Sequence, residues 1–168
     1  MGYYLAVPIL ALLAALQSSI VPQFRLYSGQ PNLILIFVLA WAVHAELEEG
    51  LLWAILGSVF SDLLSIVPLG TSALAPVAAI FVIDLFRRNL FRINLIFLAV
   101  LVPAATALQQ VIVWLVLWSR GYGVSLGDGI QYVLIPTLLM NILLFFPFYL
   151  IVRIIQRSTT RRRSAFGS

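Results

Sequence analysis

The residue whose chemistry stands out from its surroundings is Asp62, a carboxylate within an apolar stretch that runs from Gly50 to Leu74. On a helix, residues three and four positions apart share a side, so Asp62 joins a stripe of small or polar residues: Gly50, Ala54, Gly57, Ser58, Ser61 and Ser65. Such a stripe lets another backbone approach closely. We therefore predict a surface that receives a partner helix or lines a cavity, formed by this stripe and the turn containing Pro68 and Gly70.

The sequence leaves two interpretations of Asp62 open. As a buried acceptor, its carboxylate would bind Ser, Thr or a group of a partner, because lipid should not touch it. Alternatively, because Asp62 stands near the end of its helix, the carboxylate reaches water or caps the next helix around Thr71.

The other ionisable residues form no set that could catalyse a reaction. His44 precedes three glutamates closely, but the spacing matches no closed set of metal ligands and is typical of a solvated turn. Asp84 stands three and four residues before Arg87 and Arg88, which favours a local ion pair. A hydrolase needs a nucleophile with an oriented base, and a lipid phosphotransferase needs clustered carboxylates. With no cysteine either, we expect a protein with no catalytic residue, metal or cofactor.

Composition identifies the solvent of these segments as lipid. Hydrophobic residues make up 62% of the chain, charged residues make up 10%, and the mean hydropathy is +1.08. Soluble domains average about 45–50% apolar and about 25% charged residues. The apolar run over 3–21 lacks the basic start and cleavage site of a signal peptide, so we expect it to be retained. The sequence thus predicts an integral membrane protein with one domain.

Six apolar segments predict an all-α bundle of about six transmembrane helices, at about 3–21, 32–43, 46–65, 71–86, 93–118 and 130–152. The second segment spans only about 18 Å as a helix, whereas the hydrocarbon core is about 30 Å thick. It must therefore be lengthened, shielded by protein or re-entrant. We place the transmembrane domain at 1–157 and a basic, fraying tail at 158–168. In the turn before the last helix, Ser125 and Asp128 have the spacing of a cap.

Uncharged polar residues occur inside these segments, where an unpaired amide is costly. Gln109, Gln110 and Asn141 fall at similar depth, so each is expected to bond across helices, and they can pair with one another. Gln17 and the two serines after it either mark a helix end at interfacial water or make an inward polar contact. The simplest role for all four amides is architectural.

Arginine accounts for all ten basic residues and predicts the topology. Eight of them lie in two clusters, at 87–92 and 153–163, which should face the cytoplasm together with both termini. The clusters adjoin apolar segment ends and have no aromatic platform beside them. Topology and contact with anionic lipid therefore explain the basic pI near 10.0 better than nucleic-acid binding does.

Three groups of residues, taken in order, carry a resemblance to a family. They are Gln17-Ser18-Ser19 closing the first helix, Pro31-Asn32-Leu33 opening the second, and the pattern G-x6-G-x3-SD-LLS-x-x-PLG from Gly50 to Gly70. Together they resemble the bacterial rod shape-determining protein MreD over about the first ninety residues, with Asn32 standing where members usually carry an acidic residue. The second half is similar in hydropathy, length and basic tail.

This resemblance implies a non-enzymatic scaffold, multi-pass in the bacterial inner membrane, that belongs to the cell-wall elongation machinery. It implies binding to the membrane helix of MreC and regulation of peptidoglycan synthesis and cell shape. The larger complex would also contain the actin-like MreB, the glycosyltransferase RodA and a class B penicillin-binding protein. The alternative is a substrate-binding subunit of an energy-coupling-factor vitamin transporter. Such subunits are similar to the family in their number of membrane spans. Such a subunit would dock through small residues like Ala11 and Ala15.

Overall fold

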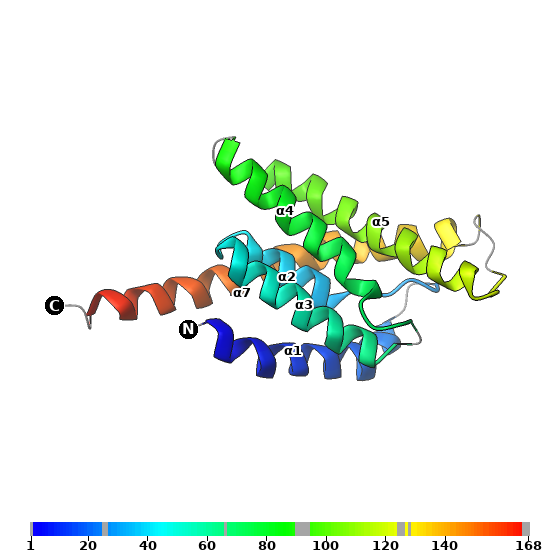
Figure 1. Cartoon of the computed structure of the whole chain (residues 1–168), viewed down its shortest axis with the longest axis horizontal. Helices are drawn as coiled ribbons and strands as arrows, with labels where there is room; N and C mark the ends of the chain where they lie inside the picture. Colours follow the sequence, from blue (N-terminus) through cyan, green and yellow to red (C-terminus); the bar gives the residue numbers. More distant parts are fainter. Residues whose placement is uncertain are drawn as a thin grey trace.

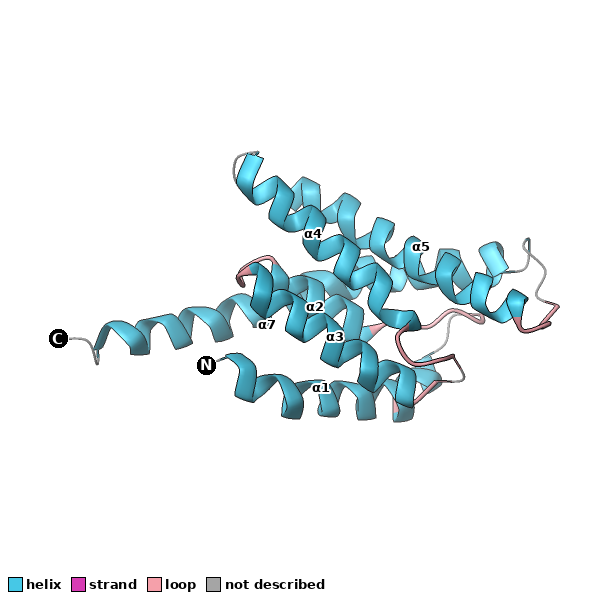
Figure 2. Ribbon diagram, in the orientation of Figure 1, coloured by secondary structure: helices cyan, strands magenta, loops and turns pink. Residues whose placement is uncertain are grey.

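The computed structural model describes residues 2–24, 27–65, 67–89, 95–123, 127 and 129–165, and within them the chain is helical with short connections (Figure 2). The long helices are α1 (Gly2–Ser19), α2 (Leu33–Ala42), α3 (Leu47–Leu63), α4 (Leu74–Asn89), α5 (Leu95–Ser119) and α7 (Ile135–Ala165). Three single-turn or short segments join them: η1 (Val21–Phe24), η2 (Thr71–Ala73) and the π-helix η3 (Gly129–Leu134). Each of the six predicted segments contains one long helix, so the all-α prediction is confirmed.

The long helices lie side by side, and the chain reverses direction from each to the next (Figure 1). As a result both termini lie at one end of the bundle, which we call the terminal end, together with the connection between α2 and α3. The opposite end, which we call the distal end, carries the connection between α3 and α4. In Figure 1, α4 and α5 form one side and α1 the other, with α2 and α3 between them.

Helix α2 is the centre of the bundle. It packs against α1, α3, α4, α5 and α7, and nine consecutive residues from Ile34 to Ala42 are buried. Its Trp41 ring stacks on Trp53 of α3, with ring centroids 4.4 Å apart, and Phe37 lies against the same Trp53 ring. Of the three alternatives for this short segment, the structure shows shielding by protein, because other helices surround all sides of α2.

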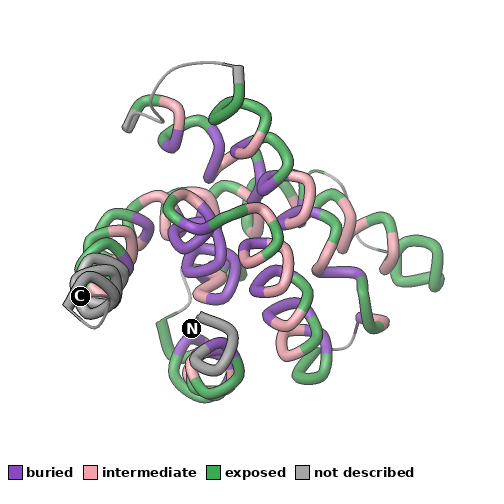
Figure 3. The backbone as a smooth tube through the Cα atoms, turned by 60° about the vertical axis from the view of Figure 1, so that its left-hand side comes forward, coloured by how far each residue is buried: buried purple, intermediate pink, exposed green. Residues whose placement is uncertain are grey.

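The exterior of the bundle is apolar, and its interior holds polar groups. Leu12, Ile96 and Leu143 are 61%, 74% and 73% exposed, whereas Asn141 is completely buried. Figure 3 shows the buried residues on the sides of the helices that face one another. Within the described residues, two helical segments are long and apolar enough to cross a membrane unaided, Ile96–Ser119 and Gly129–Ile155. An apolar exterior around polar contacts is the arrangement expected when the solvent is lipid.

The entry to α7 differs from a simple helix start, and proline explains why. Pro136 has no N–H to donate to the carbonyl of Tyr132 four residues earlier. That carbonyl accepts a bond of 3.1 Å from the N–H of Ser28 instead, and the turn before it is a π-helix. Gly29 passes so close that a Cβ there would lie 2.7 Å from the Pro136 Cβ. The polar loop after α1 is thereby fastened to α7.

Two expectations concern the ends of α7. The backbone is helical to Ala165, and the division between a transmembrane domain at 1–157 and a basic tail at 158–168 stays a prediction. The predicted cap formed by Ser125 and Asp128 lies outside the described residues.

Candidate functional site

The small stripe of α3 faces the interior of the bundle. A Cβ on Gly57 would lie 2.8 Å from Ile34 Cγ2, 3.2 Å from Val38 Cγ2 and 3.3 Å from Leu10 Cδ2. A Cβ on Gly50 would lie 3.5 Å from Ala42 Cβ and 3.4 Å from Ile80 Cγ2, which is ordinary van der Waals contact. The stripe therefore does what small residues do in lipid, which is to let helices approach closely. The helix that it receives is α2 of the same chain.

The predicted binding residues divide into two groups by burial. Those that are buried between helices of this chain are Gly50, Gly57, Ser58 and Asp62. Those that are half-buried or exposed are Ser61, Ser65, Pro68 and Gly70, all at the distal end of α3 and in the turn after it. A partner helix cannot reach the first group in this arrangement, because α2 and its neighbours already occupy the space. The second group lies beside three exposed leucines, Leu63, Leu64 and Leu69.

Asp62 caps the start of the next helical segment. Its Oδ2 accepts hydrogen bonds from the N–H of Gly70 at 2.7 Å and from the N–H of Ser72 at 3.3 Å. A carboxylate at this position also interacts favourably with the positive end of the η2–α4 helix dipole. Gly70 takes φ of +92°, which glycine adopts without strain, and so folds the turn back onto the carboxylate. The structure thus shows a cap made by a buried carboxylate, because Asp62 is only 2% exposed, and binding of a partner group by Asp62 stays a prediction.

The cap predicts different effects for two substitutions of Asp62. Asp62→Asn keeps an oxygen that can accept from both N–H groups, so we expect a loss below about 1 kcal/mol in the free energy of unfolding. Asp62→Ala leaves the two N–H groups without an acceptor and should cost about 0.5–2 kcal/mol or more. Denaturant titration of the purified protein in detergent measures both. If Asp62→Asn were as damaging as Asp62→Ala, the stabilisation would come from the negative charge of Asp62, and the two hydrogen bonds of the cap would not account for it.

A second polar site joins three helices around Asn141. The Oδ1 of Asn141 accepts from the N–H of Asn32 at 2.8 Å, and its Nδ2 donates to Thr106 Oγ1 at 2.9 Å. Asn32 in turn caps α2, because its side chain accepts from the N–H of Leu35 at 3.0 Å. An acidic residue at position 32 would supply the same acceptor. Asn141 thus bonds across helices as predicted, but its partners are Thr106 and Asn32 rather than the glutamines of α5.

The remaining amides have separate environments. Gln17 makes the inward contact, since its Oε1 accepts from the N–H of Ile34 at 3.2 Å, whereas the serines after it are exposed. Gln109 is 8% exposed, and its Oε1 is buried with no hydrogen-bond partner. Gln110 is half-buried. The prediction that both glutamines of α5 bond across helices therefore fails for the Oε1 of Gln109.

The C-terminus of α2 is capped by an arginine from α4. Arg87 donates to the carbonyls of Ala45 at 2.7 Å, Ala42 at 2.9 Å and Val43 at 3.1 Å. The predicted ion pair of Asp84 is confirmed with the neighbouring arginine, since Arg88 Nε lies 2.8 Å from Asp84 Oδ2. Arg87, Thr106 and Gly29 are the contributors that the sequence did not identify. Their partners are far away along the chain, so no local spacing could indicate them.

These two neighbouring arginines form a matched pair for mutation. Arg87→Gln should lower the free energy of unfolding by about 1–3 kcal/mol, because a charged donor to three carbonyls at the end of α2 is lost. Arg88→Gln removes the same charge but only an exposed ion pair, whose arginine side chain is 69% exposed, and should cost less than about 1 kcal/mol. Denaturant titration measures both losses. Equal losses in the two variants would contradict a stabilising cap of Arg87 on the C-terminus of α2.

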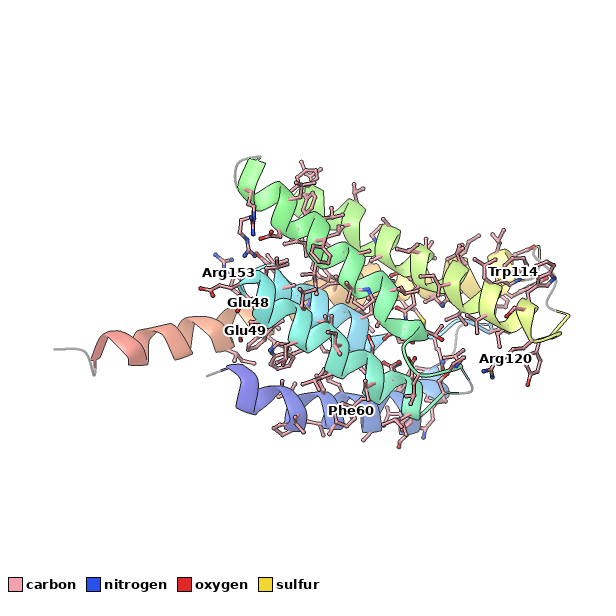
Figure 4. The ribbon with its side chains drawn as sticks, in the orientation of Figure 1. Glu48, Glu49, Phe60, Trp114, Arg120 and Arg153 are labelled. Carbon is pink, nitrogen blue, oxygen red and sulfur yellow. The ribbon has the colours of Figure 1, made fainter. Side chains whose placement is uncertain are left out.

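Within the described ranges, no group of three or more His, Cys, Asp or Glu residues is placed to hold a metal ion. The acidic turn that begins at His44 is a structural contact, in which Trp41 Nε1 donates to Glu49 Oε1 at 3.3 Å. Figure 4 shows Glu48, Glu49 and Arg153 toward the terminal end, and Trp114 and Arg120 toward the distal end. The polar sites of this chain are thus caps and cross-helix bonds.

Comparison with known families identifies a match over nearly the whole chain. The family model described as rod shape-determining protein MreD matches residues 1–159. No curated protein and no solved structure matches the chain. The match covers all six long helices except the last turns of α7.

Proposed function

The chain belongs to the MreD family of rod shape-determining proteins, and from this premise we propose that it is a non-enzymatic scaffold that binds MreC in the bacterial inner membrane and regulates peptidoglycan synthesis through it. The family match over residues 1–159 is the observation that carries the proposal. MreB, RodA and a class B penicillin-binding protein are the further members of the proposed complex.

The internal use of polar groups supports a scaffold. The carboxylate of Asp62 accepts from N–H groups of its own chain, and Arg87 bonds to carbonyls of α2. These groups hold the bundle in one arrangement, in which the small stripe of α3 is already filled by α2. The surface left for a membrane partner is therefore apolar, which suits a transmembrane helix.

We place the contact with MreC at the distal end of α3. The predicted binding residues that remain accessible, Ser61, Ser65, Pro68 and Gly70, lie there. The adjoining leucines Leu63, Leu64 and Leu69 are 62%, 58% and 64% exposed. A partner helix that packs on the leucines would bring its end to the exposed turn, where the side chain of Ser65 is exposed.

The arginines support a membrane orientation with six spans and both termini in the cytoplasm. Arg153 lies at the terminal end and Arg120 at the distal end (Figure 4), and Arg87 and Arg88 lie in the last turn of α4, which ends at the terminal end. The excess of arginine at the terminal end favours the cytoplasm for it. In this orientation the α3–α4 turn faces the cell-wall side, where the synthase acts.

A pull-down tests the proposal. The protein, tagged at its C-terminus, is purified from its own membranes in mild detergent, and the bound proteins are identified. Recovery of MreC with the elongation synthase supports the scaffold. Recovery of a pair of ATPases with a transmembrane coupling subunit would replace it with the vitamin-transporter alternative.

Site-specific crosslinking tests the surface. A photoreactive residue at Leu64 or Leu69 should crosslink to MreC, whereas the same residue at Leu143, an equally exposed leucine on α7, should not. MreC crosslinked from Leu143 alone would move the contact to α7 without affecting the scaffold proposal.

A further inference from the structure

A cavity with a polar lining lies where α2, α3, η2, α4 and α5 meet. Its lining combines apolar side chains with five polar residues: Asn32, Ser58, Ser61, Ser72 and Gln109. The cavity is partly open to the outside, and its space holds about one water molecule. The cavity is thus too small for a metabolite and too polar to resemble the rest of the interior.

The lining contains a buried acceptor that has no donor. Gln109 Oε1 is buried and unpaired. The hydroxyl of Ser58 already donates to the carbonyl of Ala54 at 2.6 Å, so its oxygen can only accept. Beside the cavity, Asp62 accepts from the N–H of Ser72 through Oδ2, while its Oδ1 is buried and unpaired. A group that satisfies Gln109 Oε1 must therefore donate a hydrogen bond, and the other serine hydroxyls of the lining can serve it as donors or acceptors.

We propose that this cavity is a hydration site, in which one water molecule donates to Gln109 Oε1 and bonds to the serine hydroxyls of the lining. Water suits the site in three respects: its size, its two donors, and its ability to satisfy the Gln109 amide in either orientation. The several polar groups of the lining supply the two to four partners that a buried water needs. The water joins α5 to α3 at a depth where no direct bond between Gln109 and α3 is formed.

Hydroxyl-radical labelling of the wild-type protein in nanodiscs tests this directly, with ¹⁸O-labelled water and mass spectrometry as the readout. A trapped water is a local source of radicals, so residues that line the site are oxidised although they are buried. Leu35 lines the cavity and is 3% exposed; Leu39, one turn later on α2, is 1% exposed and lies away from it. We expect several-fold more oxidation at Leu35 than at Leu39. Equal oxidation of the two leucines would overturn the proposal.

A variant then tests the role of Gln109. Gln109→Met keeps the length of the side chain and removes its acceptor, so it should reduce oxidation of Leu35 to the level of Leu39. Gln109→Met should also lower the midpoint of thermal unfolding by roughly 2–4 °C, since the water loses a partner. The control is Gln110→Met at the neighbouring half-buried residue, which should change neither the oxidation of Leu35 nor the midpoint. A rise in the midpoint for Gln109→Met would show a dry cavity with an unsatisfied amide and would overturn the proposal.

Discussion

Gly57→Leu is expected to prevent this protein from folding stably, with a loss of at least about 3 kcal/mol in the free energy of unfolding. Even a single added Cβ would lie 2.8 Å from Ile34 Cγ2, closer than side-chain carbons approach one another. The further carbons of leucine would have to enter α2 itself, which is buried on all sides and cannot move outward. Fluorescence-detected size exclusion of a C-terminal fusion measures the folded fraction, and we expect it to collapse.

Gly57→Ala should show a graded effect. Its Cβ meets the γ-methyl groups of Ile34 and Val38, which are stiff at χ1, and the end of Leu10. Against this crowding, alanine favours the helix by about 1 kcal/mol over glycine. The net loss should therefore be about 0–2 kcal/mol. Gly123→Leu is the matched control, because a Cβ there meets nothing within 4 Å. A normal folded fraction for Gly57→Leu would show that α3 and α2 are not packed in this way.

Because the small stripe of α3 packs against α2 of the same chain, substitutions in the stripe test folding of the bundle and not binding of a partner. The sequence predicts small residues that admit a helix, and this part of the prediction is correct. The sequence cannot predict which helix packs against the stripe, because a three- or four-residue spacing describes only one of the two helices in contact. A loss of MreC binding in a Gly57 variant would consequently report damage to the bundle. Variants at Leu64 and Leu69, which are exposed, separate binding from folding.

Local patterns predicted the elements of this fold well. Hydropathy placed six helices, and the bounds of α2 differ from the prediction by one residue at each end. The i to i+4 spacing of Asp84 and Arg88 gave the correct ion pair. These features depend on neighbours along the chain, so the sequence contains the information that they need.

The caps that Gln17 and Arg87 provide for α2 could not be predicted, because these residues are distant from α2 in sequence, whereas Asn32 is a local N-cap. The first N–H groups of α2 are satisfied by Gln17 of α1 and by Asn32, and its last carbonyls by Arg87 of α4. A helix of ten residues in the centre of a bundle has both of its unsatisfied ends inside the protein. The need for caps follows from the short apolar segment, but their identity requires the tertiary fold.

Asn141→Leu tests the most buried of these contacts and is expected to cost about 2–3 kcal/mol. Leucine has the same branching as asparagine but larger terminal groups, so the loss combines the missing hydrogen bonds with overpacking at a completely buried site. The N–H of Asn32 loses its acceptor in a buried place, whereas Thr106 still donates to the carbonyl of Val102 at 2.8 Å. Denaturant titration in detergent measures the loss, and Met140→Leu, the half-buried neighbour, should change the free energy by less than about 1.5 kcal/mol.

A double-mutant cycle then separates the two bonds of Asn141. Thr106→Val leaves the Nδ2 of Asn141 without an acceptor and should cost about 1 kcal/mol alone. In the Asn141→Leu background this amide is absent, so the same substitution should cost almost nothing, which gives a coupling of about 0.5–1 kcal/mol. Additive losses would mean that Asn141 and Thr106 do not interact. In that case the hydrogen-bond part of the effect of Asn141→Leu would belong to the bond with Asn32, and α5 would be held to α7 by apolar packing alone.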